Sequence, residues 1–290
     1  MAVPRPIDHL VLAVPDLAAA VALYGRLGFT VGAVNRHPWG TENAVIQLDG
    51  SFLELIGLGA GFALPGPHEA AAPFAAPVAA ACARGGGLAL VALGSTDADA
   101  DAAAFRVAGA GQGRRLDFGR TAVAPDGTRR DVAFGLAFAD IGLEAAGVFT
   151  CRHHRPENFW NPAAQRHANR ALRLDAVALA VPDPAPVAAR LSVALGIGPD
   201  GQAERLRFAT PTGSIDVMTP PAAAARYGGG AAPGRFAGFG MVVEALDGLR
   251  RRLAAADVPH REVAGTLVVP PEVAFGTALV FAPAPCHSVA

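Results

Sequence analysis

A ten-residue pattern occurs twice in this chain and constrains its fold more than any other feature of the sequence. Residues 7–16 read IDHLVLAVPD, and residues 174–183 read LDAVALAVPD. Each copy is an apolar run typical of a buried strand and ends in Pro-Asp, where the aspartate can cap a following helix. An alanine-rich stretch and a Leu-Gly step follow both copies. A chain that repeats a strand–helix unit is expected to repeat a whole module of its fold.

The first copy begins a module whose elements can be followed along the sequence. Gly28 is placed to end the helix, and Asp49-Gly50 is typical of a tight hairpin turn. We expect a helix at 17–27 and strands at 7–14, 29–34, 43–48 and 52–58. The predicted order of the elements is therefore βαβββ.

Three further modules fit the rest of the chain, which predicts an α+β fold of four βαβββ modules in two pairs. The pairs span residues 5–155 and 172–284, and a pseudo-twofold axis should relate them. The connectors 59–87 and 153–173 are longer than ordinary turns, and the first should contain a short helix near 77–84. The other expected elements are helices at 97–108 and 246–255 and strands at 88–93, 114–120, 131–138, 146–152, 236–243, 261–269 and 277–281.

Composition and charge exclude several classes of protein. Hydrophobic residues make up 52% of the chain and charged residues 17%, which excludes a disordered protein. A net charge of −1 gives no general attraction to nucleic acid or to an anionic membrane, so neither is expected as a partner. We find no signal peptide and no apolar stretch long enough to span a bilayer. The three cysteines form no CxxC motif, which favours a reducing compartment, and we expect a cytoplasmic protein.

Several motifs resemble the vicinal oxygen chelate superfamily, which includes glyoxalase I, extradiol dioxygenases and bleomycin-resistance proteins. Its paired βαβββ modules open on a strand such as Ile7-Asp8-His9 and carry an acidic residue such as Glu54 on the fourth strand. Residues 37–43, which read HPWGTEN, and 149–160, which read FTCRHHRPENFW, look like the glyoxalase-like subgroup. The resemblance implies that each pair of modules forms a half-barrel, a curved mixed sheet with a concave face.

This resemblance implies a metal site at His9 and Glu54. In the superfamily, these two strand positions point into the half-barrel and bind one divalent ion. Imidazole and carboxylate suit Fe(II), Mn(II), Ni(II), Co(II) or Zn(II). We expect the two side chains to approach within about 5 Å, as ligands of one ion must. The alternative is a His–Glu hydrogen bond in a polar cavity without metal.

The second module departs from the family pattern, because its first strand has no histidine and its fourth strand carries Cys151 and His153. His9, Glu54 and His153 would together form a two-histidine, one-carboxylate site. Glu54 and His153 are the predicted catalytic acid–base residues. The alternative is that His153 is a loop histidine that follows the strand. His167 is a further candidate for the cavity, brought back by the connector.

A second group of residues is predicted to bind substrate. Its members offer aromatic, hydroxyl and amide groups near the rim of the first half-barrel or on the connector, which suits a small oxygenated ligand. They are His37, Trp39, Thr41, Asn43, Phe159 and Trp160. The alternative for the two tryptophans is ordinary packing. The connector 153–169 is rich in histidine, aromatic and amide side chains, so we expect it to fold back over the first half-barrel.

The second pair of modules has lost the residue types of the metal site, since Ala176 replaces His9 and Asp216 stands alone where Glu54 stands. We expect it to bind no metal. The leading functional hypothesis is a metal-dependent lyase, isomerase or dioxygenase that acts on a small substrate with two adjacent oxygens. The alternative is a metal-free binding protein of the bleomycin-resistance kind. Four modules in one chain already supply the pairing of modules, so a monomer is expected, with a homodimer as the alternative.

Overall fold

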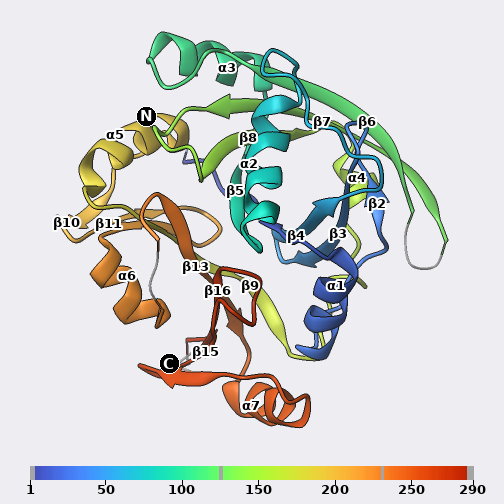
Figure 1. Cartoon of the computed structure of the whole chain (residues 1–290), viewed down its shortest axis with the longest axis vertical. Coiled ribbons are helices and arrows are strands. Elements are labelled where there is room, and N and C mark those ends of the chain that lie inside the picture. The colour runs from blue at the N-terminus through green and yellow to red at the C-terminus, as the bar shows by residue number, and fades with distance from the viewer. Residues whose placement is uncertain (1–3, 124–126, 230–231, 286–290) are drawn as a thin grey trace, which may run out of the picture.

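Two mixed sheets of eight strands form the framework of the protein (Figure 1). The computed structural model describes residues 4–123, 127–229 and 232–285. The first sheet has the order β2-β3-β4-β1-β5-β8-β7-β6. Its strands are β1 (Ile7–Ala13), β2 (Asn35–Arg36), β3 (Thr41–Leu48), β4 (Ser51–Leu58), β5 (Gly87–Gly94), β6 (Arg115–Val123), β7 (Arg129–Ala139) and β8 (Gly147–His153).

The second sheet repeats this topology strand for strand, with the order β10-β11-β12-β9-β13-β16-β15-β14. In both sheets, the first and fourth strands of each module are parallel neighbours, and the first strands of the two modules are antiparallel. The predicted fold of four βαβββ modules is therefore confirmed. The strands are β9 (Ala171–Ala180), β10 (Asp200–Gln202), β11 (Arg205–Ala209), β12 (Ser214–Met218), β13 (Arg235–Val243), β14 (Arg261–Val263), β15 (Thr266–Val269) and β16 (Ala278–Pro283).

The repeated Pro-Asp sequence explains why two helices begin at equivalent places. Asp16 accepts a hydrogen bond from the Ala19 amide at 2.9 Å, and Asp183 accepts one from the Ala185 amide at 3.2 Å. None of the helices in the described residues has both the length and the apolar character needed to cross a lipid bilayer. The helices are α1 (Leu17–Arg26), α2 (Ala72–Ala83), α3 (Ala98–Val107), α4 (Pro156–Phe159), α5 (Pro184–Leu195), α6 (Pro220–Tyr227) and α7 (Leu246–Ala255).

Several predicted boundaries are wrong. The strand expected at 29–34 is the short β2 at Asn35–Arg36. In the expected stretch the Thr30 amide donates to His167 of the connector, and the Gly32 amide donates to Val45 of β3. The strand expected at 261–269 is divided by a turn between β14 and β15. Helix α2 begins at Ala72, ahead of the predicted 77–84, and contains Pro77 in its interior. Burial of its apolar side chains offsets the hydrogen bond that the proline removes.

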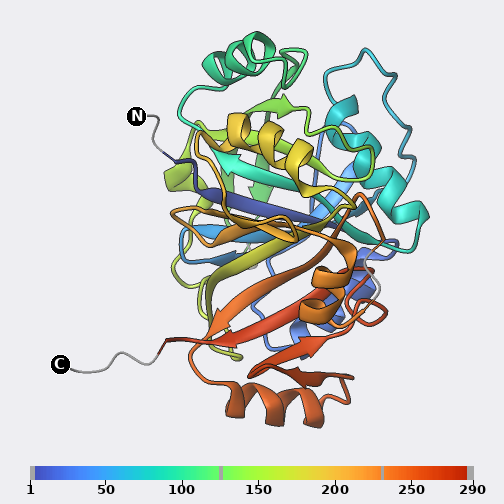
Figure 2. The same ribbon diagram turned by 90° about the vertical axis from the view of Figure 1, so that its left-hand side faces the viewer.

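One hydrophobic core extends through both halves of the chain. Leu10 and Leu12 of β1 belong to the same cluster of buried side chains as Val177 and Leu179 of β9. Helix α5, from the second half, lies beside β8 of the first (Figure 2). The division into domains at 5–155 and 172–284 stays a prediction, because the two halves share this core.

The concave faces of the two sheets differ in how they are filled. We call the concave face of the first sheet the bowl; Val11 and Ala13 of β1 lie on it and pack with helix α2. On the second sheet, Tyr227 of α6 packs against Gly238, where an added Cβ atom would lie 2.1 Å from the tyrosine ring. The second concave face is therefore closed by a large aromatic side chain, whereas the bowl keeps the polar side chains described below.

Candidate functional site

His9 and Glu54 converge on the bowl from the parallel strands β1 and β4. Glu54 is the backbone partner of Val11, two positions after His9, so both side chains lie on the concave face. The His9 Nε2 and Glu54 Oε2 atoms are 3.9 Å apart, and both residues are buried. The predicted approach within about 5 Å is therefore confirmed. Their binding of a metal stays a prediction.

Asp8 belongs to the same cluster, although strand alternation would place it on the opposite face from His9. The pairing of β1 with β5 slips between Ile7 and His9, so that Asp8 is the extra residue of a β-bulge. Asp8 Oδ1 lies 2.6 Å from His9 Nδ1 and 3.1 Å from His153 Nε2. A bulge re-aims a side chain in this way, and it cannot be read from hydrophobic alternation.

The ionised state of Asp8 sets which ring nitrogen of His9 donates a hydrogen bond. Burial alone raises the pKa of Asp8, but the hydrogen bonds and positive charge of His153 and His9 outweigh burial and hold this pKa well below its usual range. The ionised carboxylate only accepts hydrogen bonds, so His9 Nδ1 carries the proton that it donates. In the neutral imidazole the lone pair of His9 is therefore on Nε2, which faces Glu54.

The structure does not join His153 to His9 and Glu54 as predicted. His153 ends β8, and its Nε2 atom reaches Asp8, while its Nδ1 atom is buried and finds no hydrogen-bond partner among the described residues. Within the described parts of the chain, the one group of three possible ligand atoms within 4.8 Å of one another is Asp8, His9 and Cys151. The bulge places Asp8 against both imidazoles, so the two-histidine, one-carboxylate set stays a prediction.

Cys151 is buried on β8 and faces the cluster as a thiol. Burial raises its pKa well above the usual value, and the negative charges of Asp8 and Glu54 raise it further. A metal ion prefers the thiolate, so Cys151 is a ligand only if the ion displaces its proton.

His37, Thr41 and Asn43 lie deeper than the predicted rim, and all three are buried. Asn43 Nδ2 donates to Glu54 Oε1 at 2.5 Å, and His37 Nε2 lies 3.6 Å from the same oxygen. The other ring nitrogen of His37 lies 2.9 Å from Thr41 Oγ1. Burial, with the charges of Arg120 and His9, lowers the pKa of His37 to about 3, so this imidazole is neutral at physiological pH. Burial raises the pKa of Glu54, although His9, Asn43 and Arg120 oppose the change.

Trp39 lies behind His37 and lines neither of the hollows described below. The two rings are stacked, with centroids 4.6 Å apart and planes inclined by 7°. Trp39 also packs edge-on against Phe74 and Phe118. This residue therefore orients His37, which agrees with the packing alternative for Trp39.

The connector folds back over the bowl, as predicted. Gln47 of β3 holds it in place: its side-chain amide donates to the Phe159 carbonyl at 2.7 Å and accepts from the Asn161 amide at 2.9 Å. His167 is not a cavity residue, which corrects that prediction. It accepts a hydrogen bond from the Thr30 amide at 3.0 Å, and its Nε2 atom lies 2.8 Å from the Gln47 carbonyl. His167 therefore attaches the connector to the back of β3.

Two hollows in the bowl share Val45, Arg120 and Phe159 in their walls. The inner hollow, of about 30 Å³, is lined by His9, Glu54, His37, Asn43 and Cys151 together with six phenylalanines. The outer hollow, of about 130 Å³, lies under the connector and is lined on that side by Asn158, Phe159, Trp160, Asn161 and Ala164. Of the predicted substrate-binding residues, His37, Asn43, Phe159 and Trp160 line these hollows, while Trp39 and Thr41 support them from behind.

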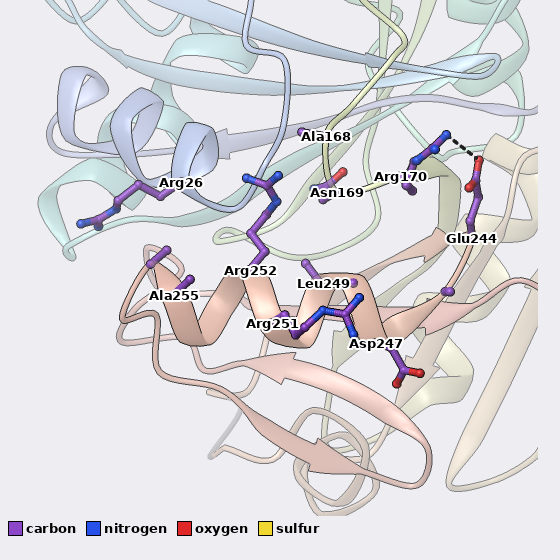
Figure 3. Close-up of a pocket in the computed structure, with 13 residues that line it drawn as sticks. Arg26, Ala168, Asn169, Arg170, Glu244, Asp247, Leu249, Arg251, Arg252 and Ala255 are labelled. Carbon is purple, nitrogen blue, oxygen red and sulfur yellow. Dashed lines mark ion pairs between the residues drawn. The ribbon is translucent and has the colours of Figure 1, made fainter.

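A wider hollow, of about 890 Å³, lies elsewhere, between α1, the connector and α7 (Figure 3). Arginines from these three segments line it, and Arg170 forms a 3.6 Å ion pair with Glu244. Both partners are at least half exposed, at 70% and 50%. None of the predicted site residues lines this hollow. We therefore place the candidate site in the bowl.

The second half contains one acidic residue at the position of Glu54. Asp216 of β12 is fully buried and forms an ion pair with Arg205 at 2.9 Å. The backbone partner of Asp216 on β9 is Ala178, and Ala176 lies two positions before it, as His9 does before the partner of Glu54. The carboxylate thus already has a cationic partner, in agreement with the loss of the His–Glu pair in this half.

The paired βαβββ modules, with a histidine and a glutamate meeting on the concave face, define a protein of the vicinal oxygen chelate superfamily. The glyoxalase-like domain family matches residues 7–195, which is more than half of the chain, so this protein belongs to that family. A comparison with curated protein sequences gives no match.

Solved structures share the fold across nearly the whole chain. A hypothetical protein from Staphylococcus aureus is similar with a TM-score of 0.64 at 8% identity, over 96% of this chain and 99% of that one. A mutant 4-hydroxymandelate synthase from Streptomyces coelicolor is similar with a TM-score of 0.60 at 16% identity, over 97% and 92% of the two chains. A fusion protein of a xylose isomerase-like TIM barrel with 4-hydroxyphenylpyruvate dioxygenase is similar with a TM-score of 0.52 at 14% identity. That match covers 99% of this chain and 50% of the fusion protein. At these identities, the likeness establishes the fold alone.

Proposed function

We propose that this protein is a metal-dependent enzyme of the glyoxalase-like type, in which His9 and Glu54 hold one divalent ion in the bowl. The observation that carries the proposal is the 3.9 Å separation of His9 Nε2 and Glu54 Oε2, in a buried cluster where Asp8 already occupies His9 Nδ1. Metal-binding histidines commonly donate their other ring N–H to a carboxylate, which fixes the tautomer and raises the basicity of the ligating nitrogen. Asp8 supports His9 in this way.

The donor set fits a divalent ion of the first transition row. An imidazole nitrogen and a carboxylate oxygen suit Fe(II), Mn(II), Ni(II), Co(II) or Zn(II), and Cys151 offers a third, softer ligand. The inner hollow of about 30 Å³ has room for an ion and little else beyond the reacting atoms of a substrate. When bound, the ion would act as a Lewis acid toward two adjacent substrate oxygens.

The residues around the pair are suited to moving a proton. Because burial raises the pKa of Glu54, this carboxylate can accept a proton closer to neutral pH than an exposed glutamate can. Asn43 holds one of its oxygens, and the neutral His37 beside it adds no positive charge. A lyase, an isomerase or a dioxygenase can use this combination, and we propose one of these reactions on a small vicinal-oxygen substrate.

Metal content tests the proposal directly. Protein purified without a metal-affinity tag is treated with a chelator, titrated with each of the five ions, and assayed for bound metal. We expect about one ion per chain in the wild type and a strong loss of affinity in His9→Ala and Glu54→Gln. His68→Ala is the matched control, because His68 is an exposed histidine outside the bowl. Equal metal binding by His9→Ala and His68→Ala would overturn the proposal.

A metal-free binding protein is the second candidate, and the six phenylalanines of the inner hollow favour it. An aromatic cavity can hold an apolar ligand without an ion. The two functions differ in the effect of His9→Ala, which should abolish an activity that needs metal but leave sequestration of an apolar ligand largely intact. For either function, we propose a small-molecule partner, a cytoplasmic location and a monomer, with a homodimer as the alternative.

A further inference from the structure

Arg120 stands at the junction of the inner and outer hollows. It lies on β6, where Leu116, Phe118 and Arg120 alternate with solvent-facing residues, so that its side chain points into the bowl. Its neighbour across the ladder is Val132 of β7, which also lines the outer hollow. Any ligand that passes from the outer hollow toward His9 and Glu54 therefore passes the Arg120 guanidinium.

The guanidinium of Arg120 lacks a partner. Its Nε and Nη1 atoms are shielded from solvent and have no hydrogen-bond partner among the described residues. Burial lowers its pKa, and the charge of Glu54 opposes this change only from beyond ion-pairing distance. Arginine remains charged in proteins, and a largely buried charge without a hydrogen-bond partner is unfavourable. No described side chain accepts a hydrogen bond from these two nitrogens, which points to a ligand that does.

We propose that Arg120 binds the carboxylate of a small organic acid whose apolar body occupies the outer hollow. The Nη2 atom, which is not among the shielded nitrogens, forms one edge of the guanidinium with Nε and another with Nη1, and two parallel N–H groups on one edge match the two oxygens of a carboxylate. The inference deepens the proposed function by naming the substrate class. It rests on that function only in placing the reacting oxygens near His9 and Glu54.

The surroundings favour a carboxylate over a phosphate. Arg120 is the one arginine among the described residues that line the inner hollow, and Glu54 faces the same space with a carboxylate. A phosphate dianion would need further donors and would be repelled by Glu54. The outer hollow offers Phe159 and Trp160 as apolar walls, so the acid should carry an aromatic or other apolar group.

The test uses chelator-treated full-length protein, so that carboxylate binding is measured apart from metal binding. Acetate, benzoate and phenylacetate are titrated by calorimetry, with benzamide as the neutral analogue of benzoate and inorganic phosphate as the competing anion. The variants are Arg120→Gln and Arg120→Lys. Arg130→Gln is the matched control, because Arg130 lines the same outer hollow but is exposed to solvent.

We expect benzoate or phenylacetate to bind the wild type more tightly than benzamide or phosphate. Arg120→Gln should weaken this binding by about ten- to a hundredfold, as expected for loss of a charged hydrogen-bonded pair. Arg120→Lys should be intermediate, since it keeps the charge but lacks the two-donor edge. Arg130→Gln should stay within about twofold of the wild type, because an exposed charge contributes little.

Three binding results would overturn the assignment. They are failure of all three carboxylates to bind the wild type, equal losses in Arg120→Gln and Arg130→Gln, and phosphate binding as tight as benzoate binding. Thermal melting of Arg120→Gln without ligand provides a second readout. Removal of a buried unpaired charge should leave the melting temperature unchanged or raise it, whereas a large decrease would show that Arg120 has a structural role and would also overturn the proposal. Failure of His9 and Glu54 to bind metal would affect the proposed function and leave these results unchanged.

Discussion

Asp8→Asn tests the arrangement of the cluster most sharply, because it keeps the size of the side chain and removes only its charge. Asp8 accepts from His9 at 2.6 Å and from His153 at 3.1 Å, and its side chain is 12% exposed. Hydrogen bonds to a charged group contribute about 1.5–3 kcal/mol each and are roughly twice as strong as neutral ones. If each of the two bonds keeps half of its strength, the variant loses about 1.5–3 kcal/mol. The neutral amide is less costly to bury than a carboxylate, which reduces the expected loss to about 1–2 kcal/mol.

Two assays measure the consequences. Chemical denaturation of chelator-treated protein should show the loss of about 1–2 kcal/mol in the free energy of unfolding. Metal titration should show an affinity about ten- to a hundredfold lower, because Asp8 no longer holds the Nε2 lone pair of His9 toward Glu54. Asp49→Asn is the control, since Asp49 is an exposed aspartate in the β3–β4 turn. Wild-type metal affinity in Asp8→Asn would refute the role of the β-bulge in presenting His9.

Three further substitutions probe the connector and the second half. Because burial lowers the pKa of His167 from 6.5, only the unfolded chain gains this proton just below pH 6.5. The free energy of unfolding should thus fall as the pH drops below 6.5, by at most about 1.4 kcal/mol per pH unit. Denaturation at pH 7.5 and 5.5 should show a smaller fall in His167→Gln than in the wild type. An equal fall in the two proteins would contradict this prediction. Trp160→Ala should lower the free energy of unfolding by about 1–2 kcal/mol, less than for a fully buried tryptophan, and leave metal content unchanged; loss of metal would place Trp160 in the ion site. Gly238→Ala should destabilise by about 1–3 kcal/mol or more through its contact with Tyr227, as measured by thermal melting, and a neutral result would show that α6 can move away.

The sequence was sufficient to predict the modular fold and the convergence of His9 with Glu54. Both depend on strand alternation and on the repeated Pro-Asp helix start, which are local signals with a fixed period. Leu53 and Leu55 belong to the cluster on the opposite face of the sheet from Glu54, as alternation requires. The length of an edge strand such as β2 depends on which groups accept hydrogen bonds from the backbone amides nearby. For the Thr30 amide the acceptor is His167, a residue far along the chain.

The parts of the site that sequence reasoning missed have different origins. Asp8 was hidden because a β-bulge breaks the period on which the prediction relied. The contact of His153 with Asp8 was hidden for the same reason, since Asp8 is the extra residue of the bulge. Arg120 left a readable signal, because it continues the inward-facing series of Leu116 and Phe118 on β6, but its lack of a partner is visible only in three dimensions.

The core that runs through both halves has a consequence for cooperativity. Because Leu10 and Leu12 pack in one cluster with Val177 and Leu179, neither sheet can lose its apolar face without exposing that of the other. The two halves should therefore unfold in a single transition, with equal calorimetric and van't Hoff enthalpies, in spite of their separate sheets. A destabilising substitution far from the bowl then lowers the fraction of molecules in which the bowl is folded. The second half, which lacks the His–Glu pair, in this way controls how much of the first is available to bind a ligand.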